Sequence, residues 1–430
     1  MSESLQTARR DIGLKRRYRA ECRFRAYGVL AVCVGLLFLV ILLWSIIAQG
    51  YSAFQQTSMT LPVYFDEHVI DPKGERQSNP KVLITANYPL LVRNALAEKL
   101  GVDKNDHGAM RELNRMISGG VRVEIRKILH AHPDFIGTTQ TITVLAAADI
   151  DSAFKGQIDL NVPQQNRKVS DRQVAWMKKL SSQGILYKAF NKGLFTFGAS
   201  SRPETSGLGV AMIGSAYMMA IVLVLSLPIG VATAIYLEEF ARRSRFNDII
   251  EVNINNLAAV PSIVFGLLGL SVFINFLHLP RASSLVGGLV LTLMTLPTII
   301  IATRAALRAV PRSIRNAALG LGASKTQAVF GHVLPLALPG ILTGTILGLA
   351  RALGETAPLL LIGMVAFVVN YPTTPLDPAT ALPVQVYMWA NEPERAFSER
   401  TFGAIIILMG FLAVMNIAAV LLRRKFERRW

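Results

Sequence analysis

The chain has 430 residues, 52% of them apolar, and a formal net charge of +17 from 45 Lys and Arg against 28 Asp and Glu. The apolar residues are gathered into long blocks, which excludes a soluble globular protein and indicates an integral membrane protein. Much of the basic excess flanks these blocks instead of forming one patch, so the charge does not favour nucleic-acid binding.

The N-terminal part consists of a basic segment, residues 1–26, and a first apolar block, residues 27–49. The block is longer than the apolar core of a signal peptide, about 7–15 residues, and no clear cleavage site follows it. We therefore expect an uncleaved transmembrane anchor. The two cysteines, Cys22 and Cys33, precede this block and lie inside it, so they cannot form a disulfide framework outside the membrane.

Five further apolar blocks have the length of membrane helices. They lie at 208–237, 252–277, 284–307, 340–369 and 402–422. The sequence thus predicts an α-helical integral membrane protein with six transmembrane helices. Prolines that can kink these helices are Pro228, Pro261, Pro297 and Pro358.

Basic residues mark one side of the predicted membrane. They precede the first block and follow the last at Arg9, Arg10, Lys15, Arg16, Arg17, Arg19, Arg23, Arg25, Arg423, Arg424, Lys425, Arg428 and Arg429. The loops predicted on the same side carry Arg242, Arg243, Arg245, Arg304, Arg308, Arg312, Arg315 and Lys325. The positive-inside rule therefore predicts that both termini are cytoplasmic.

A polar stretch, residues 50–207, separates the anchor from the other apolar blocks. Its pattern predicts an α/β domain outside the cytoplasm. Alternating apolar residues predict two strands, around Leu61, Val63, Phe65 and around Val121, Val123, Ile125. Helices are expected at Tyr88–Leu100, Asp106–Ser118 and Asp171–Gln183, the last capped by Ser170 or Asp171 and stopped by Gly184. The Gly, Ser and Pro content of Gly198–Gly209 predicts a hinge into the second span, where we place the domain boundary.

This domain carries no recognisable catalytic or metal motif. Its histidines are His68, His107, His130 and His132, and the last three lack ligand spacing with partners, so we interpret them as surface residues and expect no metal site.

Arg351 and Glu355 are ionisable residues inside or beside an apolar block. Counted from Gly340, Arg351 is expected near the middle of the bilayer, on one helix face with Glu355. Charges at that depth usually face a bundle interior or a water-filled path. The two side chains can simply neutralise each other; alternatively, Arg351 attracts a tetrahedral oxyanion, and Glu355 is its salt-bridge partner or a proton acceptor.

Residues 308–339, the coupling segment, are too polar to insert and predict a helix, a turn and a second helix. We expect Ser313 to cap the first helix, Gly322 to make the turn, Ser324 to cap the second helix and Pro335 to stop it. The pair can be a projection that a partner moves, or an amphipathic surface helix on lipid headgroups.

The stretch Gly320–Thr326 superficially resembles a phosphate-binding loop. It lacks the glycine required before Lys325 and follows no strand. We therefore expect that this chain is not an enzyme and has no ATPase site.

The coupling segment resembles the inner loop of the membrane subunits of ABC importers. The matching residues are Asn316, Ala317, Ala318, Gly322, Ala323, Val333, Leu334 and Pro335. Asn316 stands where that family usually has a glutamate, which removes one charged contact. The remaining pattern implies that this loop couples the chain to an ATPase.

More narrowly, residues 205–430 resemble the PstA-type permeases of phosphate importers. The segments that carry this resemblance are Pro228–Phe240, Ala258–Leu270, Leu338–Leu360 and Ala381–Ala390. It implies a type I importer bundle over residues 208–430 in a bacterial inner membrane, with Arg351 and Glu355 on the phosphate path. The α/β domain departs from the common form of the family, and its position suggests contact with the binding protein or the partner permease.

The resemblance also implies the partners. They are a second, PstC-like permease chain, PstB-like ATP-binding subunits that hold the ATP and Mg, and an external phosphate-binding protein. No cofactor is expected on this chain itself. The residues leave two alternatives open, namely a permease for sulfate, molybdate or phosphonate, and a membrane sensor or scaffold whose outer domain reads a ligand. A role in reporting phosphate supply is also open.

Overall fold

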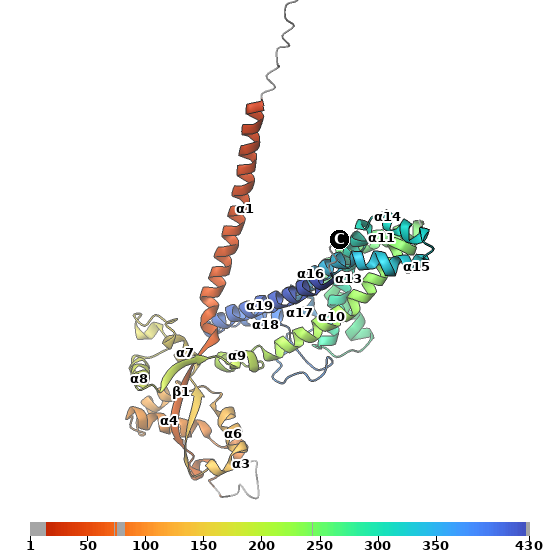
Figure 1. Cartoon of the computed structure of the whole chain (residues 1–430). Helices are drawn as coiled ribbons and strands as arrows, with labels where there is room; N and C mark the ends of the chain where they lie inside the picture. Colours follow the sequence, from red (N-terminus) through yellow and green to blue (C-terminus); the bar gives the residue numbers. More distant parts are fainter. Residues whose placement is uncertain (1–13, 73, 75–81, 243, 427–430) are drawn as a thin grey trace, which may run out of the picture. The chain divides into compact units, whose positions relative to one another are not determined.

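The computed structural model describes residues 14–72, 74, 82–242 and 244–426. Of the basic residues used to predict orientation, Arg9, Arg10, Arg243, Arg428 and Arg429 lie outside the described residues. The chain divides into two compact units between Gln49 and Gly50. The described part of the first unit, residues 14–49, lies in the long helix α1 (Leu14–Gly50; Figure 1). The side chains of this helix are almost all exposed, and its two cysteines are free.

The second unit begins with an α/β domain. Its elements are η1 (Tyr51–Phe54), β1 (Gln55–Tyr64), α2 (Glu67–Ile70), α3 (Val82–Thr85), α4 (Tyr88–Leu100), α5 (His107–Asn114), α6 (Val121–Ala131), η2 (Pro133–Phe135), β2 (Thr139–Leu145), α7 (Ala148–Phe154), η3 (Gln164–Asn166), α8 (Asp171–Ser182), β3 (Leu186–Phe190), α9 (Gly193–Thr196) and η4 (Pro203–Thr205). The strands form an antiparallel sheet in the order β2-β1-β3, with Leu61 opposite Ile142 and Met59 opposite Leu186.

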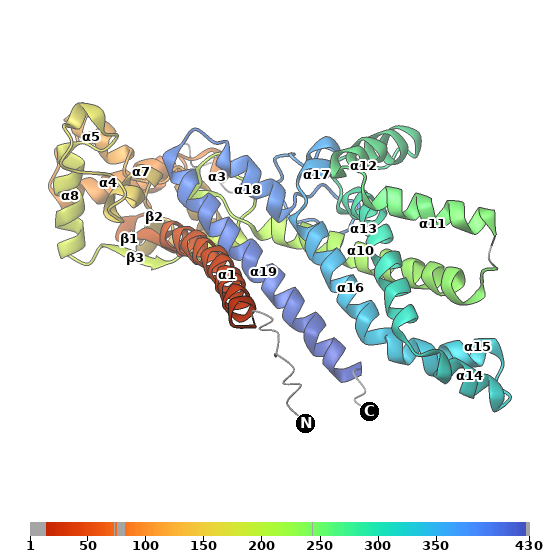
Figure 2. The ribbon, with the colours of Figure 1, turned by 90° about the horizontal axis from the view of Figure 1, so that it is seen from above.

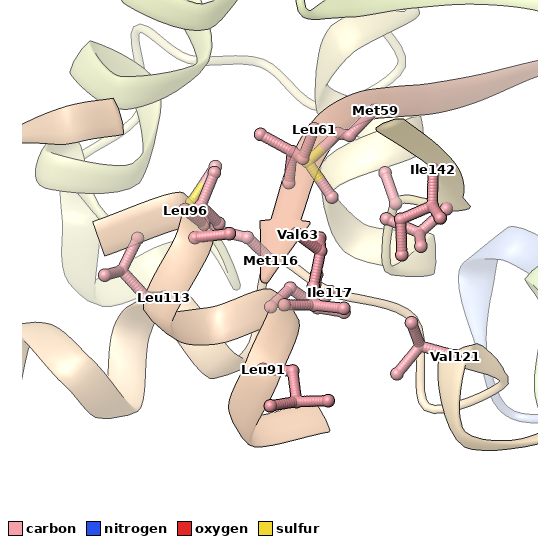
Figure 3. Close-up of a cluster of buried hydrophobic side chains, with 14 of the residues drawn as sticks. Met59, Leu61, Val63, Leu91, Leu96, Leu113, Met116, Ile117, Val121 and Ile142 are labelled. Carbon is pink, nitrogen blue, oxygen red and sulfur yellow. The ribbon is translucent and has the colours of Figure 1, made fainter. Parts of the chain in front are cut away.

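One face of this sheet packs on the helices and builds the domain's core. Met59, Leu61 and Val63 alternate inward from β1 and meet side chains of α4, α5, α6 and β2 (Figure 3). Because strand side chains alternate between faces, the same register leaves Pro62 and Tyr64 on the exposed face. The strand predicted around Leu61 is therefore confirmed.

The strand predicted around Val123 is wrong, because these residues form helix α6. Val121, Ile125 and Leu129 are fully buried, whereas Val123 is exposed. This is the four-residue spacing of a helix, and over five residues it cannot be told from the two-residue spacing of a strand.

The predicted N-termini of two helices in the domain are confirmed. Ser170 caps α8 with a full capping box to Gln173, and Gly184 follows with a positive φ of 69°. Asp106 caps α5 and accepts from the backbone N–H of Ala109, but α5 ends at Asn114, earlier than expected. Helix α4 has the predicted bounds.

The remaining elements form a helical bundle. They are α10 (Gly209–Ile235), the π-helical turn η5 (Tyr236–Phe240), α11 (Arg245–Ala258), α12 (Ser262–Gly269), the π-helical turn η6 (Leu270–Phe276), α13 (Ser284–Ala309), α14 (Arg312–Gly320), α15 (Lys325–Ala328), the π-helical turn η7 (Val329–Val333), α16 (Leu334–Gly354), α17 (Ala357–Leu361), α18 (Leu382–Ala390) and α19 (Arg395–Phe426). Helix α13 packs against both α10 and α16 (Figure 2).

Among the described residues, five helices are long and apolar enough to span a membrane, or six if a bent pair is one span. The bent pair, α11 with α12 and η6, corresponds to the span predicted at 252–277 and is bent by 101° at the break between its two helices. Pro261 lies at the turn, and a proline disfavours helical geometry in the residue before it. A helical membrane protein with a small α/β domain is thus confirmed.

The span predicted at 340–369 is wrong at both ends. The helix starts before Gly340 and ends at Gly354, after which Glu355 is extended with ψ at 128°. Gly363 has a positive φ of 89° beyond the short helix α17, so the apolar residues that follow do not continue the helix.

Candidate functional site

Arg351 lies in the last turn of α16, and Glu355 follows the helix as its C-terminal cap. Arg351 Nε is 3.8 Å from Glu355 Oε1, which is an ion pair longer than a hydrogen bond. The structure therefore brings the two predicted residues together. It corrects their setting, because Arg351 is at one end of the helix instead of its middle and Glu355 is outside it.

Helix α16 turns Arg351 away from the core of its own bundle. Leu349, Ala352 and Leu353 are buried in a cluster that also contains residues of α10, α12 and α13. The Arg351 side chain, by contrast, is 50% exposed and that of Glu355 is 20% exposed. A guanidinium at a membrane helix needs water, an anion or another protein surface beside it. The Arg351 face of α16 is therefore directed away from the packed core of the bundle.

Glycines hold α16 unusually close to α13. A Cβ at Gly344 would lie 2.2 Å from the Ala302 Cβ, and one at Gly340 would lie 2.7 Å from the Ala306 Cβ. Small residues four apart on both helices let the backbones approach, as is common between membrane helices. This contact fixes the rotation of α16 and hence the direction in which Arg351 points.

The coupling segment forms the expected helix pair. Helix α14 ends in a turn at Gly322, whose φ is 89°, and Ser324 caps α15 with a full capping box to Gln327. Figures 1 and 2 show α14 and α15 at the end of α13. The turn and the second cap are confirmed.

Two details of that prediction are wrong. Pro311, not Ser313, precedes α14 as its N-cap, because the proline's φ of −56° and its missing N–H suit the start of a helix. Pro335 does not stop the second helix, which continues from α15 through η7 into α16. The wider π-helical turn directly before Pro335 accompanies this continuation.

The residues matched to the importer loop divide into an exposed and a packed set. Asn316, Ala317 and Gly322 are exposed, and Leu321 beside them is 90% exposed. The others, Ala318, Ala323, Val333, Leu334 and Pro335, are buried or half-buried. The tip of the turn thus presents an apolar side chain and open backbone outward.

Sequence reasoning did not find a group of carboxylates at this end of the bundle. Glu238 pairs with Arg304 and Arg308 at 3.4 and 2.9 Å, and Glu251 lies 2.8 Å from Arg304. These pairs connect η5, α11 and α13. The sequence does place Glu238 and Glu251 near the predicted basic loop. Which arginine each carboxylate contacts, however, depends on how the helices pack.

Several apolar helices, a charged residue exposed beside them and a projecting helix pair define a multi-pass membrane subunit of a transporter. Residues 226–430 match the family described as binding-protein-dependent transport system inner membrane component, and residues 11–164 match a domain of unknown function (DUF3333). The chain is therefore the permease component of a bacterial binding-protein-dependent ABC transporter, a multi-pass membrane protein and a non-enzymatic transport subunit.

Individual relatives narrow this class. Phosphate transport system permease protein PstA 1 of Mycobacterium tuberculosis is 34% identical over 229 residues, which are 53% of this chain and 74% of that protein. The PstA protein of Haemophilus influenzae is 31% identical over 240 residues, 54% of this chain and 84% of that protein. The chain belongs to the PstA family of phosphate transport system permeases, with an additional N-terminal domain.

Some solved structures are similar to about half of the chain. The inward-facing MetNI methionine ABC transporter superposes with a TM-score of 0.41 and 17% sequence identity, over 51% of this chain and 98% of that chain. A bacterial ABC transporter involved in alginate import superposes with a TM-score of 0.39 and 13% identity, over 51% of this chain and 79% of that chain.

Proposed function

We propose that this chain forms, with a second permease chain, the membrane path for inorganic phosphate in an ATP-driven importer that works by alternating access. The observation that carries the proposal is Arg351, half-exposed at the end of α16 and only loosely paired with Glu355 at 3.8 Å. A rigid cation with unused donors attracts a tetrahedral oxyanion, and a weak site releases it again. That the relatives named above are phosphate permeases supports phosphate as the oxyanion.

The domain organisation follows from this function. Residues 1–26 are a cytoplasmic tail, residues 27–49 are an anchor helix, residues 50–207 are an extracytoplasmic domain, and residues 208–430 are the permease bundle. Together with the anchor, the chain has six transmembrane helices, and both termini are cytoplasmic. The division of the chain after Gln49 and the small sheet that follows it support this order. The partners are a PstC-like permease, PstB-like subunits that bind ATP and Mg, and an external phosphate-binding protein.

The coupling segment is the contact with the ATP-binding subunits. Leu321 is 90% exposed at the turn between α14 and α15, and an apolar side chain in that position fits a groove on a partner better than water. We assign the contact to Asn316, Ala317 and Gly322, which are exposed, with Ala318, Ala323, Leu334 and Pro335 as its support.

The test is uptake of radiolabelled phosphate into proteoliposomes that contain the reconstituted complex. Arg351→Ala is expected to lower uptake at least tenfold, while assembly and ATP hydrolysis persist; Glu355→Gln is compared in parallel. If Arg351→Ala transports like the wild type, the pair is structural and the path lies elsewhere. Competition by sulfate or molybdate at concentrations equal to phosphate would instead identify a permease for another oxyanion.

A further inference from the structure

The α/β domain is joined to the first turns of α19 by buried charges. Lys155, the C-cap residue of α7, has its Nζ 2.7 Å from Asp151 Oδ2 and 3.0 Å from Glu399 Oε1. The three side chains are 3%, 8% and 7% exposed. Asp151 in turn accepts from the backbone N–H of Thr57 at 2.8 Å, so a chain of polar contacts runs from β1 to α19.

A second buried contact lies next to the first. Arg400 is 4% exposed and donates from Nη1 to the carbonyl of Ser206 at 2.9 Å. Glu204, two residues earlier, is also buried; it accepts from the Ser118 hydroxyl at 2.9 Å, and its carbonyl accepts from the Gln56 amide. These contacts hold the segment Gly198–Gly209, where the sequence predicts a hinge, to β1 and to α19.

Close backbone packing reinforces these contacts. A Cβ at Gly50 would lie 2.8 Å from the Phe402 carbonyl, and one at Gly403 would lie 2.6 Å from the Ala53 Cβ. Ala53 and Leu194, at the two ends of the domain, share one apolar cluster with α18 and α19. Both chain connections of the domain are thus packed on the same pair of helices.

Helix α19 continues from this junction to the Arg351 end of α16. Its residues Leu408, Phe411, Leu412 and Met415 pack against the cluster that holds Leu349, Ala352 and Leu353. Packed interiors transmit displacement because they are dense and compress little. A movement of the domain therefore reaches the residues on either side of Arg351 through a single helix.

We propose that Lys155 is a positioning residue of the transport cycle. Through Glu399 it makes the α/β domain and α19 one rigid body, so that a binding protein docked outside displaces α19 and, with it, the Arg351 end of α16. A salt bridge buried this completely contributes little net stability, yet breaking it by removing one partner leaves uncompensated charge. Its use here is to fix one arrangement of domain and helix. The link to Arg351 rests on the proposed function; the rigid body does not.

The first experiment measures rigidity without any transport. In the full complex, with Cys22 and Cys33 replaced by serine, spin labels are placed at Tyr64→Cys and Leu422→Cys, which are exposed at the far ends of β1 and α19. The distance distribution is expected to be narrow with Lys155 present and at least twice as broad with Lys155→Met. Equal widths would overturn the proposal.

The second experiment separates docking from transmission. ATP hydrolysis by the complex in proteoliposomes is titrated with the external binding protein loaded with phosphate. Lys155→Met is expected to lower the maximal stimulated rate at least fivefold, with basal hydrolysis and the half-saturating concentration unchanged. The charge swap Lys155→Glu with Glu399→Lys is expected to recover at least half of that rate, because opposite charges again face each other at positions 155 and 399.

The matched control is Lys168→Met. It breaks the Lys168–Asp149 pair of the same domain, which spans 3.6 Å with side chains 61% and 49% exposed, and it is expected to change neither readout. A higher half-saturating concentration with an unchanged maximal rate would make the domain a docking site only and would overturn the proposal. The two proposals fail separately. Phosphate uptake that is unchanged in Arg351→Ala would overturn the phosphate path, whereas stimulated ATP hydrolysis that is unchanged in Lys155→Met would overturn this link.

Discussion

Arg315 on α14 donates from Nη2 to Glu239 Oε1 in η5 across 2.6 Å, and the two side chains are 19% and 8% exposed. The same guanidinium also donates to the carbonyls of Leu307 and Val310 at 2.8 and 2.7 Å. One side chain therefore fastens the first helix of the coupling segment to α13 and to the end of α10. A force applied at α14 reaches two bundle helices through it.

Replacing Arg315 with alanine should uncouple ATP hydrolysis from transport. It removes the contacts to Glu239, Leu307 and Val310 at once and leaves the Glu239 carboxylate without this cation. We expect the uptake per ATP hydrolysed to fall at least fivefold in proteoliposomes, while hydrolysis itself continues. Arg312→Ala, an exposed position on the same helix, is the control and should transport normally. Unchanged coupling in Arg315→Ala would show that α14 acts through other contacts.

Gly322 should not tolerate a side chain. Its φ of 89° is a region where an L-residue is strained by roughly 1–2 kcal/mol. Gly322→Ala is expected to destabilise the turn by about that amount and to lower binding of the ATP-binding subunits, measured by co-purification. Gly320→Ala, where an added Cβ meets nothing within 4 Å, should be neutral or slightly stabilising. Equal behaviour of the two variants would contradict the turn geometry.

The contact between α16 and α13 makes a comparison of two helical glycines informative. Gly344→Ala places a Cβ 2.2 Å from Ala302, so the helices must separate, and overpacking of this kind costs about 1–3 kcal/mol. Gly410→Ala on α19 meets nothing within 4 Å and should be tolerated. The thermal midpoint of the detergent-solubilised protein should drop for the first variant only. A drop for both would point to a general cost of replacing glycine.

Glu124 on α6 should make the α/β domain less stable at neutral pH than in mild acid. Burial raises the pKa of its carboxyl, against smaller opposing effects of the Leu145 backbone N–H and of Lys127. Its Oε2 is buried and has no hydrogen-bond partner among the described residues. Because the folded-state pKa lies above the unfolded value, stability is full below the unfolded pKa and falls as pH rises through the folded one.

Glu124→Gln is therefore expected to stabilise the domain at pH 7.5, with a gain that shrinks as the pH falls and the wild-type carboxyl becomes protonated. Hydrogen exchange of the α6 amides at several pH values measures this. Glu98→Gln, at an exposed position of α4, should show no such gain. A loss of protection in Glu124→Gln at pH 7.5 would mean that the ionised carboxylate is needed.

The sequence by itself determined the features that depend on neighbouring residues. The helix caps at Ser170 and Ser324 and the turn at Gly322 depend on contacts between residues a few positions apart. The membrane-spanning blocks are recognised from their length and apolar composition. The juxtaposition of Arg351 and Glu355 belongs here too, since their spacing alone keeps them close. Five consecutive residues such as Val121–Ile125, however, fit a helix and a strand alike.

Only the tertiary structure decided which way these local elements face and what they meet. The outward direction of Arg351 follows from the glycine contact of α16 with α13, and the size of the bend at Pro261 and the end of α16 at Gly354 were not predicted from the sequence. Lys155 and Glu399 are 244 residues apart in the chain. No local rule pairs them, because their meeting depends on how the entire intervening chain folds, which is a property of the assembled core.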